Sequence, residues 1–90
     1  MATEFQLQIY TQVRKVYEGR VTSIIVPAAT GYLGVLANHA PLLATLGEGK
    51  LTVKHNDESE EHYHVTGGFL EVRDNVATLL VDRLEDLPGQ

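Results

Sequence analysis

Histidines are the side chains of this sequence best suited to metal binding or proton transfer, and there are four of them. His62 and His64 are two residues apart, so on a strand they would project from one face, a spacing that some zinc sites use. Zinc needs three or four converging ligands, and the chain has no cysteine to supply one. Further ligands would therefore have to come from a neighbouring strand.

The sequence "KLTVKHNDESEEHYHVT" predicts the β-hairpin that surrounds this histidine pair. The burial pattern restricts its register, because a slip of one residue would turn a strand inside out. We predict a loop of residues 56–60, which places Val53 opposite Tyr63 and Leu51 opposite Val65. Both strands then bury the same face.

In this register the side chains near the two histidines do not form a metal site. Lys54 lies opposite His62, which puts a fixed cation where a ligand should be. His55 points to the other face, beside Glu61. We therefore predict no metal ligands and polar side chains on a solvated sheet face. The alternative is a small metal-dependent β enzyme that uses His62 and His64.

The other reactive residue types also lack the arrangement that catalysis needs. The acidic hairpin tip would be too exposed to raise a carboxyl pKa, and its spacing does not match a calcium loop; it comprises Asp57, Glu58, Glu60 and Glu61. Ser23 and Ser59 are the only serines, and neither lies in a strand–turn–helix elbow. The glycines do not form a phosphate loop. We predict no catalytic residue and no cofactor.

Length and charge restrict the partners of the chain. Ninety residues suit a single domain with a modest core. The formal charge of -5, from 12 acidic and 7 basic residues, argues against binding a phosphate backbone, so nucleic acid is not an expected partner. The start of the sequence lacks a signal-peptide pattern, and no apolar run approaches the roughly 18 residues of a spanning helix. We expect a soluble protein of the cytoplasm.

Apolar and polar residues alternate with the period of β-strands, and no useful run has the period of a helix. The clearest strand is residues 4–10; a weaker one at 13–18 ends at Gly19, and a β-branched run at 20–26 ends at Pro27. A last hairpin turns around residues 73–75. The pattern predicts an all-β fold, a small antiparallel sandwich or flattened barrel of about eight to ten short strands. We assign residues 1–83 to this domain and 84–90 to a short frayed tail.

The segment "GYLGVLANHAPLLATLGEGKLTV" from Gly31 to Val53 is dense in apolar residues yet interrupted by glycines and a proline. These predict two corners close together, with Ala40 extended because it precedes Pro41. His39 would either bond to backbone through its ring nitrogens or contact a partner. Loops at one end of a rigid sandwich are suitable places for a binding surface.

The chain contains two specific motifs, "GYLG" followed by "HAPLL" within residues 31–43 and "TGGFLEV" at residues 66–72. They resemble the N-terminal β-sandwich domain of the epsilon subunit of F-type ATP synthases, called delta in mitochondria. The family typically has a glycine-acidic-leucine-glycine turn followed by Pro-Gly-His-Ala-Pro-Leu-Leu. Here "GYLG" is followed by "HAPLL" at the same spacing. The family's Ser-Gly-Gly-hydrophobic-hydrophobic-Glu-Val is matched by "TGGFLEV" at residues 66–72. The resemblance spans nearly the whole chain.

The resemblance implies a non-catalytic rotor subunit of a proton- or sodium-translocating ATP synthase. The sandwich would dock on the gamma subunit and on the polar loops of the membrane rotor ring, and so couple rotation to ATP synthesis. It would be peripheral to the cytoplasmic face of the inner or thylakoid membrane, without inserting into the bilayer. By position, the residues facing gamma and the ring would form one end of the sandwich: Gly31, Tyr32, Leu33, Gly34, Asn38, His39, Ala40, Pro41 and Leu42.

The chain departs from the family pattern in three respects. Tyr32 replaces the usual acidic residue, so an ion pair with a basic ring loop would be either replaced by aromatic contact or lost. Asn38 replaces a glycine but tolerates the left-handed conformation that such a turn needs. The two antiparallel helices of most members do not follow the sandwich, so we expect neither inhibition of hydrolysis nor ATP binding by this chain. An alternative function is a generic adaptor that binds a peptide at a sheet edge.

Overall fold

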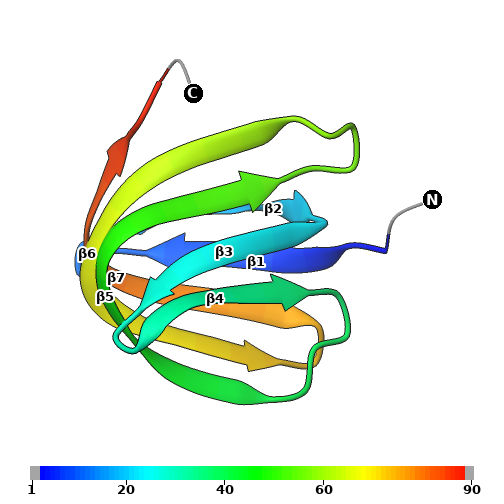
Figure 1. Ribbon diagram of the computed structural model, residues 1–90, viewed down its shortest axis with the longest axis horizontal. Coiled ribbons are helices and arrows are strands. Elements are labelled where there is room, and N and C mark those ends of the chain that lie inside the picture. The colour runs from blue at the N-terminus through cyan, green and yellow to red at the C-terminus, as the bar shows by residue number, and fades with distance from the viewer. Residues whose placement is uncertain (1–2, 89–90) are drawn as a thin grey trace.

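The computed structural model describes residues 3–88 as one seven-stranded β-sheet curled into a sandwich (Figure 1). The strands are β1 (Phe5–Tyr10), β2 (Lys15–Val21), β3 (Ser23–Ala28), β4 (Gly31–Leu36), β5 (Leu42–Lys54), β6 (Glu60–Arg73) and β7 (Val76–Asp86). Their order is β2-β1-β7-β6-β5-β3-β4. The described residues contain no helix, and hence none long and apolar enough to cross a membrane. The all-β prediction is confirmed.

Three strands are much longer than the short ones predicted, which is why the sheet has seven rather than eight to ten. β5 and β6 have 13 and 14 residues and curve through a wide bend that carries them from one layer into the other (Figure 1). Their pairing skips Gly47 and Gly67 but resumes in the same register. Gly67 and Gly68, with φ of 65° and 120°, let β6 bend without ending.

The sheet is mixed rather than wholly antiparallel. β1 lies between β2 and β7 and runs parallel to β7, with Leu7 opposite Ala77 and Ile9 opposite Leu79. This pair joins segments from opposite ends of the chain. Alternation along a strand shows which face is buried but carries no information about its neighbour, so the parallel pair could not be predicted.

The core follows the predicted alternation. A fully buried row crosses the sheet from Ile9 on β1 through Leu79 on β7 to Leu70 on β6. The other large side chains of the core have at most 2% of their surface exposed: Phe5, Leu7, Val21, Ile24, Val26, Val35, Leu51, Val53 and Val65. At about 25 cal/mol per Å² of apolar surface removed from water, this layer is the main stabilising contribution of the fold.

Two predicted strand ends are wrong. β2 continues through Gly19 to Val21, and β3 continues through Pro27 to Ala28. Proline has no N–H and was therefore expected to end the strand. The strand tolerates it because the β3·β5 pairing is interrupted between Ile25 and Ala28, so no ladder hydrogen bond from residue 27 to β5 is missing.

The hairpin around the histidines has the predicted faces but a different register. Leu51 lies opposite Tyr63 and Val53 opposite Glu61, two positions away from the prediction. The five-residue loop is 55–59, because Lys54 and Glu60 are the last paired residues. Within the loop the N–H of His55 donates to the Ser59 carbonyl at 2.9 Å. A shift of two residues preserves the side-chain alternation, so burial alone could not distinguish the two registers.

The chain beyond residue 83 was expected to fray, and for residues 84–86 this is wrong. β7 runs to Asp86, with Leu84 opposite Val65 and Glu85 opposite His64. The N–H of Leu87 then donates to the His62 carbonyl at 3.0 Å. The strand thus crosses the predicted domain boundary, while the end of the predicted tail, residues 89–90, lies outside the described part.

Candidate functional site

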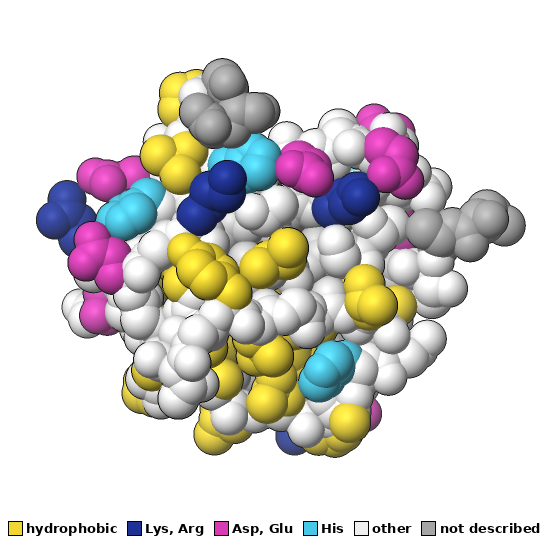
Figure 2. Space-filling view, in the orientation of Figure 1, with side chains coloured by type: hydrophobic (Ala, Val, Ile, Leu, Met, Phe, Trp, Pro, Cys, Tyr) yellow, Lys and Arg dark blue, Asp and Glu magenta, His cyan; other side chains and the backbone are white. Residues whose placement is uncertain are grey.

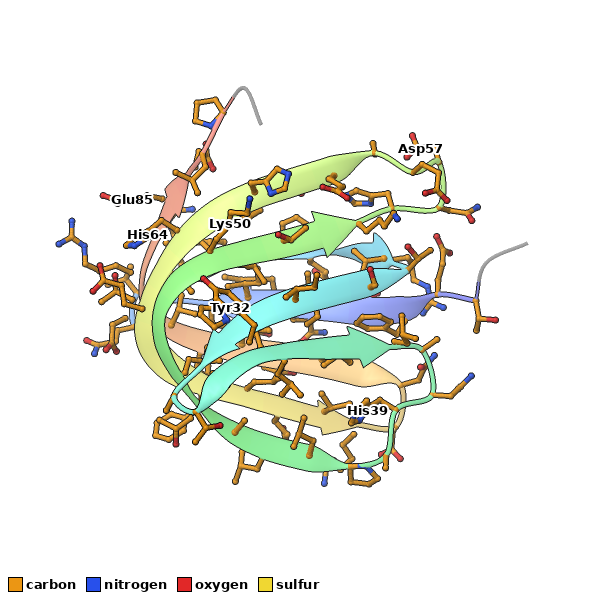
Figure 3. All side chains as sticks on the ribbon, in the orientation of Figure 1. Tyr32, His39, Lys50, Asp57, His64 and Glu85 are labelled. Carbon is orange, nitrogen blue, oxygen red and sulfur yellow. The ribbon has the colours of Figure 1, made fainter. Side chains whose placement is uncertain are left out.

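The predicted contact residues lie on β4 and in the segment that follows it, up to the first residue of β5, and not at one end of the sandwich. Gly31 and Tyr32 follow the β3–β4 turn, whereas the segment from Asn38 to Leu42 follows the opposite end of β4. Figure 3 shows Tyr32 and His39 at these two ends. The prediction of two neighbouring corners is wrong because residues 31–36 form a strand, which extends the chain by roughly 17 Å.

The predicted residues share a free sheet edge instead. Within residues 3–88, β4 pairs only with β3, and β2 at the other edge pairs only with β1. We call residues 31–36 the β4 edge. The loop 37–41 continues it to the start of β5. This edge, with its flanking loop, is the candidate functional site.

Tyr32 is held by the strands beside it. Its hydroxyl accepts a hydrogen bond of 3.1 Å from the backbone N–H of Lys50, two strands away on β5. A Cβ atom at Gly49 would lie 2.6 Å from the same hydroxyl and 2.9 Å from the Cβ of Pro27. The tyrosine therefore crosses β3 at its pairing interruption and satisfies a donor there. It remains 63% exposed, so its outer surface is available to a partner.

The loop after β4 has a defined conformation. Asn38 adopts φ of 62°, the left-handed conformation predicted for it, and its N–H donates to the side-chain oxygen of Asn75 at 2.7 Å. Half-buried His39 places Nδ1 2.7 Å from the Ala40 carbonyl. A carbonyl only accepts, so Nδ1 is the donor. Of the two alternatives for His39, the structure thus has a ring nitrogen bonded to backbone.

Asn75 joins this loop to the start of β1, a role that the sequence did not reveal. Besides accepting from Asn38, its side chain donates to the Glu4 carbonyl at 3.0 Å, and its own carbonyl accepts from the N–H of Gln6 at 3.2 Å. The sequence suggested only a turn residue, since Asp74 and Asn75 were expected to tolerate positive φ. Both do, with φ of 54° and 63°. The tertiary bonds depend on strands far apart in the sequence.

Replacing Asn75 by glycine should separate the role of Asn75 in the turn from the role of its side-chain hydrogen bonds. Glycine keeps the positive φ but removes two side-chain hydrogen bonds, so we expect Asn75→Gly to lower the free energy of unfolding by about 1–3 kcal/mol. Asp74→Gly is the matched control, because the Asp74 side chain is 89% exposed and meets only Arg73, at 3.9 Å. Urea unfolding of both variants measures the difference. Equal stabilities would contradict the role assigned to the Asn75 side chain.

The strand histidines each lie beside a carboxylate. His62 Nε2 is 3.2 Å from Glu60, and His64 Nε2 is 3.3 Å from Glu48. His64 and Glu85 are neighbours in Figure 3, with Nδ1 3.9 Å from the carboxylate. No group of three or more potential ligands within residues 3–88 is arranged to hold a metal ion. Lys54 lies opposite Glu60 rather than His62, so the cation expected to disfavour a metal is elsewhere.

Two tyrosines near the hairpin have raised pKa values. The rings of Tyr17 and Tyr63 meet edge to face at 6.3 Å, and the Tyr63 hydroxyl donates to Glu61 at 3.0 Å. Burial raises the pKa of Tyr17 to about 12, and the Glu61 carboxylate adds to the rise. Burial and then the Glu61 hydrogen bond also raise the pKa of Tyr63. Both phenols are therefore neutral at physiological pH, with a packing role.

The acidic hairpin tip contains a carboxyl group whose pKa is lowered rather than raised. Both the hydroxyl and the N–H of Ser59 donate to Asp57, at 2.6 and 3.0 Å, and these bonds lower the pKa of Asp57. Figure 3 places Asp57 at the exposed end of the hairpin. An ionised, exposed carboxylate that closes its own turn has the structural role expected of it.

The curled sheet with its exposed, uncharged edge strand defines a small β-sandwich domain. The chain belongs to the delta/epsilon chain family of ATP synthases: the model of the family's β-sandwich domain matches residues 4–87. The resemblance inferred from the two motifs is confirmed, as is the sandwich fold.

Curated relatives agree with this assignment. A protein of Dichelobacter nodosus named ATP synthase epsilon chain is 42% identical over 82 residues, which are 91% of this chain and 57% of the relative. One of Chlorobium limicola with the same name is 41% identical over 78 residues, 87% of this chain and 89% of the relative. The chain thus spans little more than half the length of the first relative.

Two solved structures share the fold. A chain of the Euglena gracilis mitochondrial ATP synthase, in a structure of OSCP, F1 and the c-ring, superposes with a TM-score of 0.90 at 24% identity, covering 100% of this chain and 57% of that one. A chain of the Tetrahymena thermophila mitochondrial ATP synthase, in a structure of the central stalk and c-ring, superposes with a TM-score of 0.74 at 19% sequence identity. The match covers 94% of this chain and 68% of that one. At these identities the comparison concerns the fold alone.

Proposed function

We propose that this chain is the β-sandwich part of the epsilon subunit in the central stalk of an F-type ATP synthase. It catalyses nothing, docks on the gamma subunit and on the polar loops of the rotor ring, and couples rotation to ATP synthesis from the surface of the membrane. The observation that carries the proposal is the family match over residues 4–87, with relatives named ATP synthase epsilon chain at about 40% identity.

The charge distribution supports a protein-facing surface around the β4 edge. All charged residues of the sequence lie outside residues 21–47, a segment that comprises β3, β4 and the start of β5. Several large apolar side chains in it are exposed, namely Tyr32 at 63%, Leu36 at 65% and Leu43 at 73%. In Figure 2 patches of hydrophobic side chains are spread over the middle and lower part of this face, while most of the charged ones lie along its upper and left margins. Depletion of charge with exposed apolar residues is typical of the centre of an interface.

Leu36→Asp tests the proposal without disturbing the core. Leu36 is an exposed side chain of β4, so a carboxylate there remains solvated in the free chain but would be desolvated in a complex. We expect the affinity for the cognate gamma subunit to fall at least tenfold, or about 1.4 kcal/mol, in isothermal titration calorimetry.

The control is Val13→Asp. Val13 is 85% exposed and lies between β1 and β2, far from β4 in the strand order. We expect it to bind gamma like the unmodified chain, and both variants to keep a β-type circular dichroism spectrum. Unchanged binding by Leu36→Asp, or an equal loss in Val13→Asp, would count against this surface. Failure of the unmodified chain to bind gamma would refute the proposed function itself.

A further inference from the structure

The two edges of the sheet differ in their protection against pairing with another strand. β2 carries Lys15, Glu18 and Arg20, and its pairing shifts between Ile9 and Tyr10. Charges and irregular pairing are the devices by which edge strands avoid adding a further strand. The β4 edge has the sequence "GYLGVL", with no charge and no proline, and pairs with β3 in one unbroken register. It has none of these devices.

The backbone groups that this edge leaves open can be identified. The β3–β4 connection has two residues, so Ala28 and Gly31 form the hydrogen-bonded pair that closes it. Pairs then alternate, and the next one, Pro27 with Tyr32, does not exchange hydrogen bonds, in keeping with the missing N–H of proline. By the same alternation the N–H and C=O groups of Tyr32, Gly34 and Leu36 point away from β3, toward the open edge.

The side chains of the same three residues leave room beside the open backbone. Tyr32 leans across β3 toward Lys50 and away from the edge (Figure 3). Gly34 has no side chain, and nothing lies within 4 Å of the position where a Cβ would be. Leu36 is 65% exposed. Between Tyr32 and Leu36 the outer face therefore has space for a large apolar side chain from an added strand.

We propose that the β4 edge binds its stalk partner by strand addition. An uncharged extended strand of the gamma subunit pairs with Tyr32, Gly34 and Leu36 through main-chain hydrogen bonds and places a large apolar side chain opposite Gly34. This inference rests on the proposed function and adds to it the mode of binding. A second copy of the chain is a poor occupant, because symmetric pairing would set Gly34 against itself without side-chain contact, and each copy carries a charge of -5.

Gly34→Pro and Gly34→Ala form a matched pair that tests the edge. The φ of Gly34 is not positive and its Cβ position is open, so alanine fits. Proline is tolerated on an edge strand where the lost N–H faces outward, and of the two variants only proline removes that N–H. Because that N–H takes no part in pairing with β3, both variants should keep the fold by circular dichroism. We expect Gly34→Pro to lose at least tenfold in affinity for gamma, and Gly34→Ala less than threefold, by calorimetry.

Amide hydrogen exchange of the unmodified chain provides a second measurement that does not depend on a variant folding. We expect the amides of Tyr32, Gly34 and Leu36 to exchange rapidly in the free chain and to become protected in the complex with gamma. If gamma binds but these amides stay unprotected, or Gly34→Pro binds normally, strand addition is refuted while the proposed function stands. A dimer of the free chain that Gly34→Pro abolishes would also refute it, because a second copy would then occupy the edge. If gamma does not bind the unmodified chain at all, the proposed function and strand addition are both refuted.

Discussion

Gly68→Ala is expected to lower the free energy of unfolding by about 3–5 kcal/mol, the largest effect of any single methyl group added to this fold. The added Cβ would overlap the carbonyl oxygen of Leu80 and lie 2.8 Å from the Cα of Val81, both backbone atoms of β7. The φ of Gly68 is also 120°, which L side chains rarely adopt. Neither problem can be relieved by moving a flexible side chain.

The size of this effect matters because a domain of this length is stabilised by only roughly 5–13 kcal/mol. Denaturant unfolding of the variant measures the loss directly, and Gly34→Ala is the control. Its Cβ enters open space at an ordinary φ, so we expect a change within about 0.5 kcal/mol. Equal stability of the two variants would show that β6 does not approach β7 closely at Gly68. The second glycine of the "TGG" motif is thus explained by packing, without any ligand.

Leu79→Ala should cost about 2–5 kcal/mol, because it leaves a cavity in a core strand that is paired on both sides. Leu79 is fully buried on β7 between Ile9 of β1 and Leu70 of β6. These neighbours belong to strands paired on both sides and have little freedom to collapse into the space. Thermal and urea unfolding, with the slope of the urea transition checked for constancy, measures the loss.

Leu80→Ala is the control, one residue further along the same strand. Leu80 points to the outer face and is 52% exposed, so its truncation should cost less than about 1 kcal/mol. The contrast between adjacent leucines tests the register of β7, since a slip of one residue would exchange their faces. A larger loss for Leu80→Ala than for Leu79→Ala would show that the slipped register is correct.

Local chemistry explains which features could be predicted. The alternation of Phe5, Leu7 and Ile9 assigned the buried face of β1, because burial of one strand face is visible in a period of two. The turn at Asp74 and Asn75 was predicted because both residues tolerate positive φ. By contrast, Gly19 and Pro27 were wrongly taken as strand ends, since whether a strand tolerates them depends on its neighbours.

The sequence alone determined the strand faces, the absence of helical periodicity and the motifs that indicate the family, because each depends on residues close together in the chain. Strand order, the parallel β1·β7 pair and the hairpin register required the folded chain, since a strand is compatible with several neighbours and with shifts of two residues. The same holds for the proposed docking surface. Its residues were predicted as one end of the sandwich, but their place on an open edge follows from β4 pairing with β3 alone. An edge strand is open because no other strand pairs with one of its sides, and a local sequence pattern does not show which strands pair.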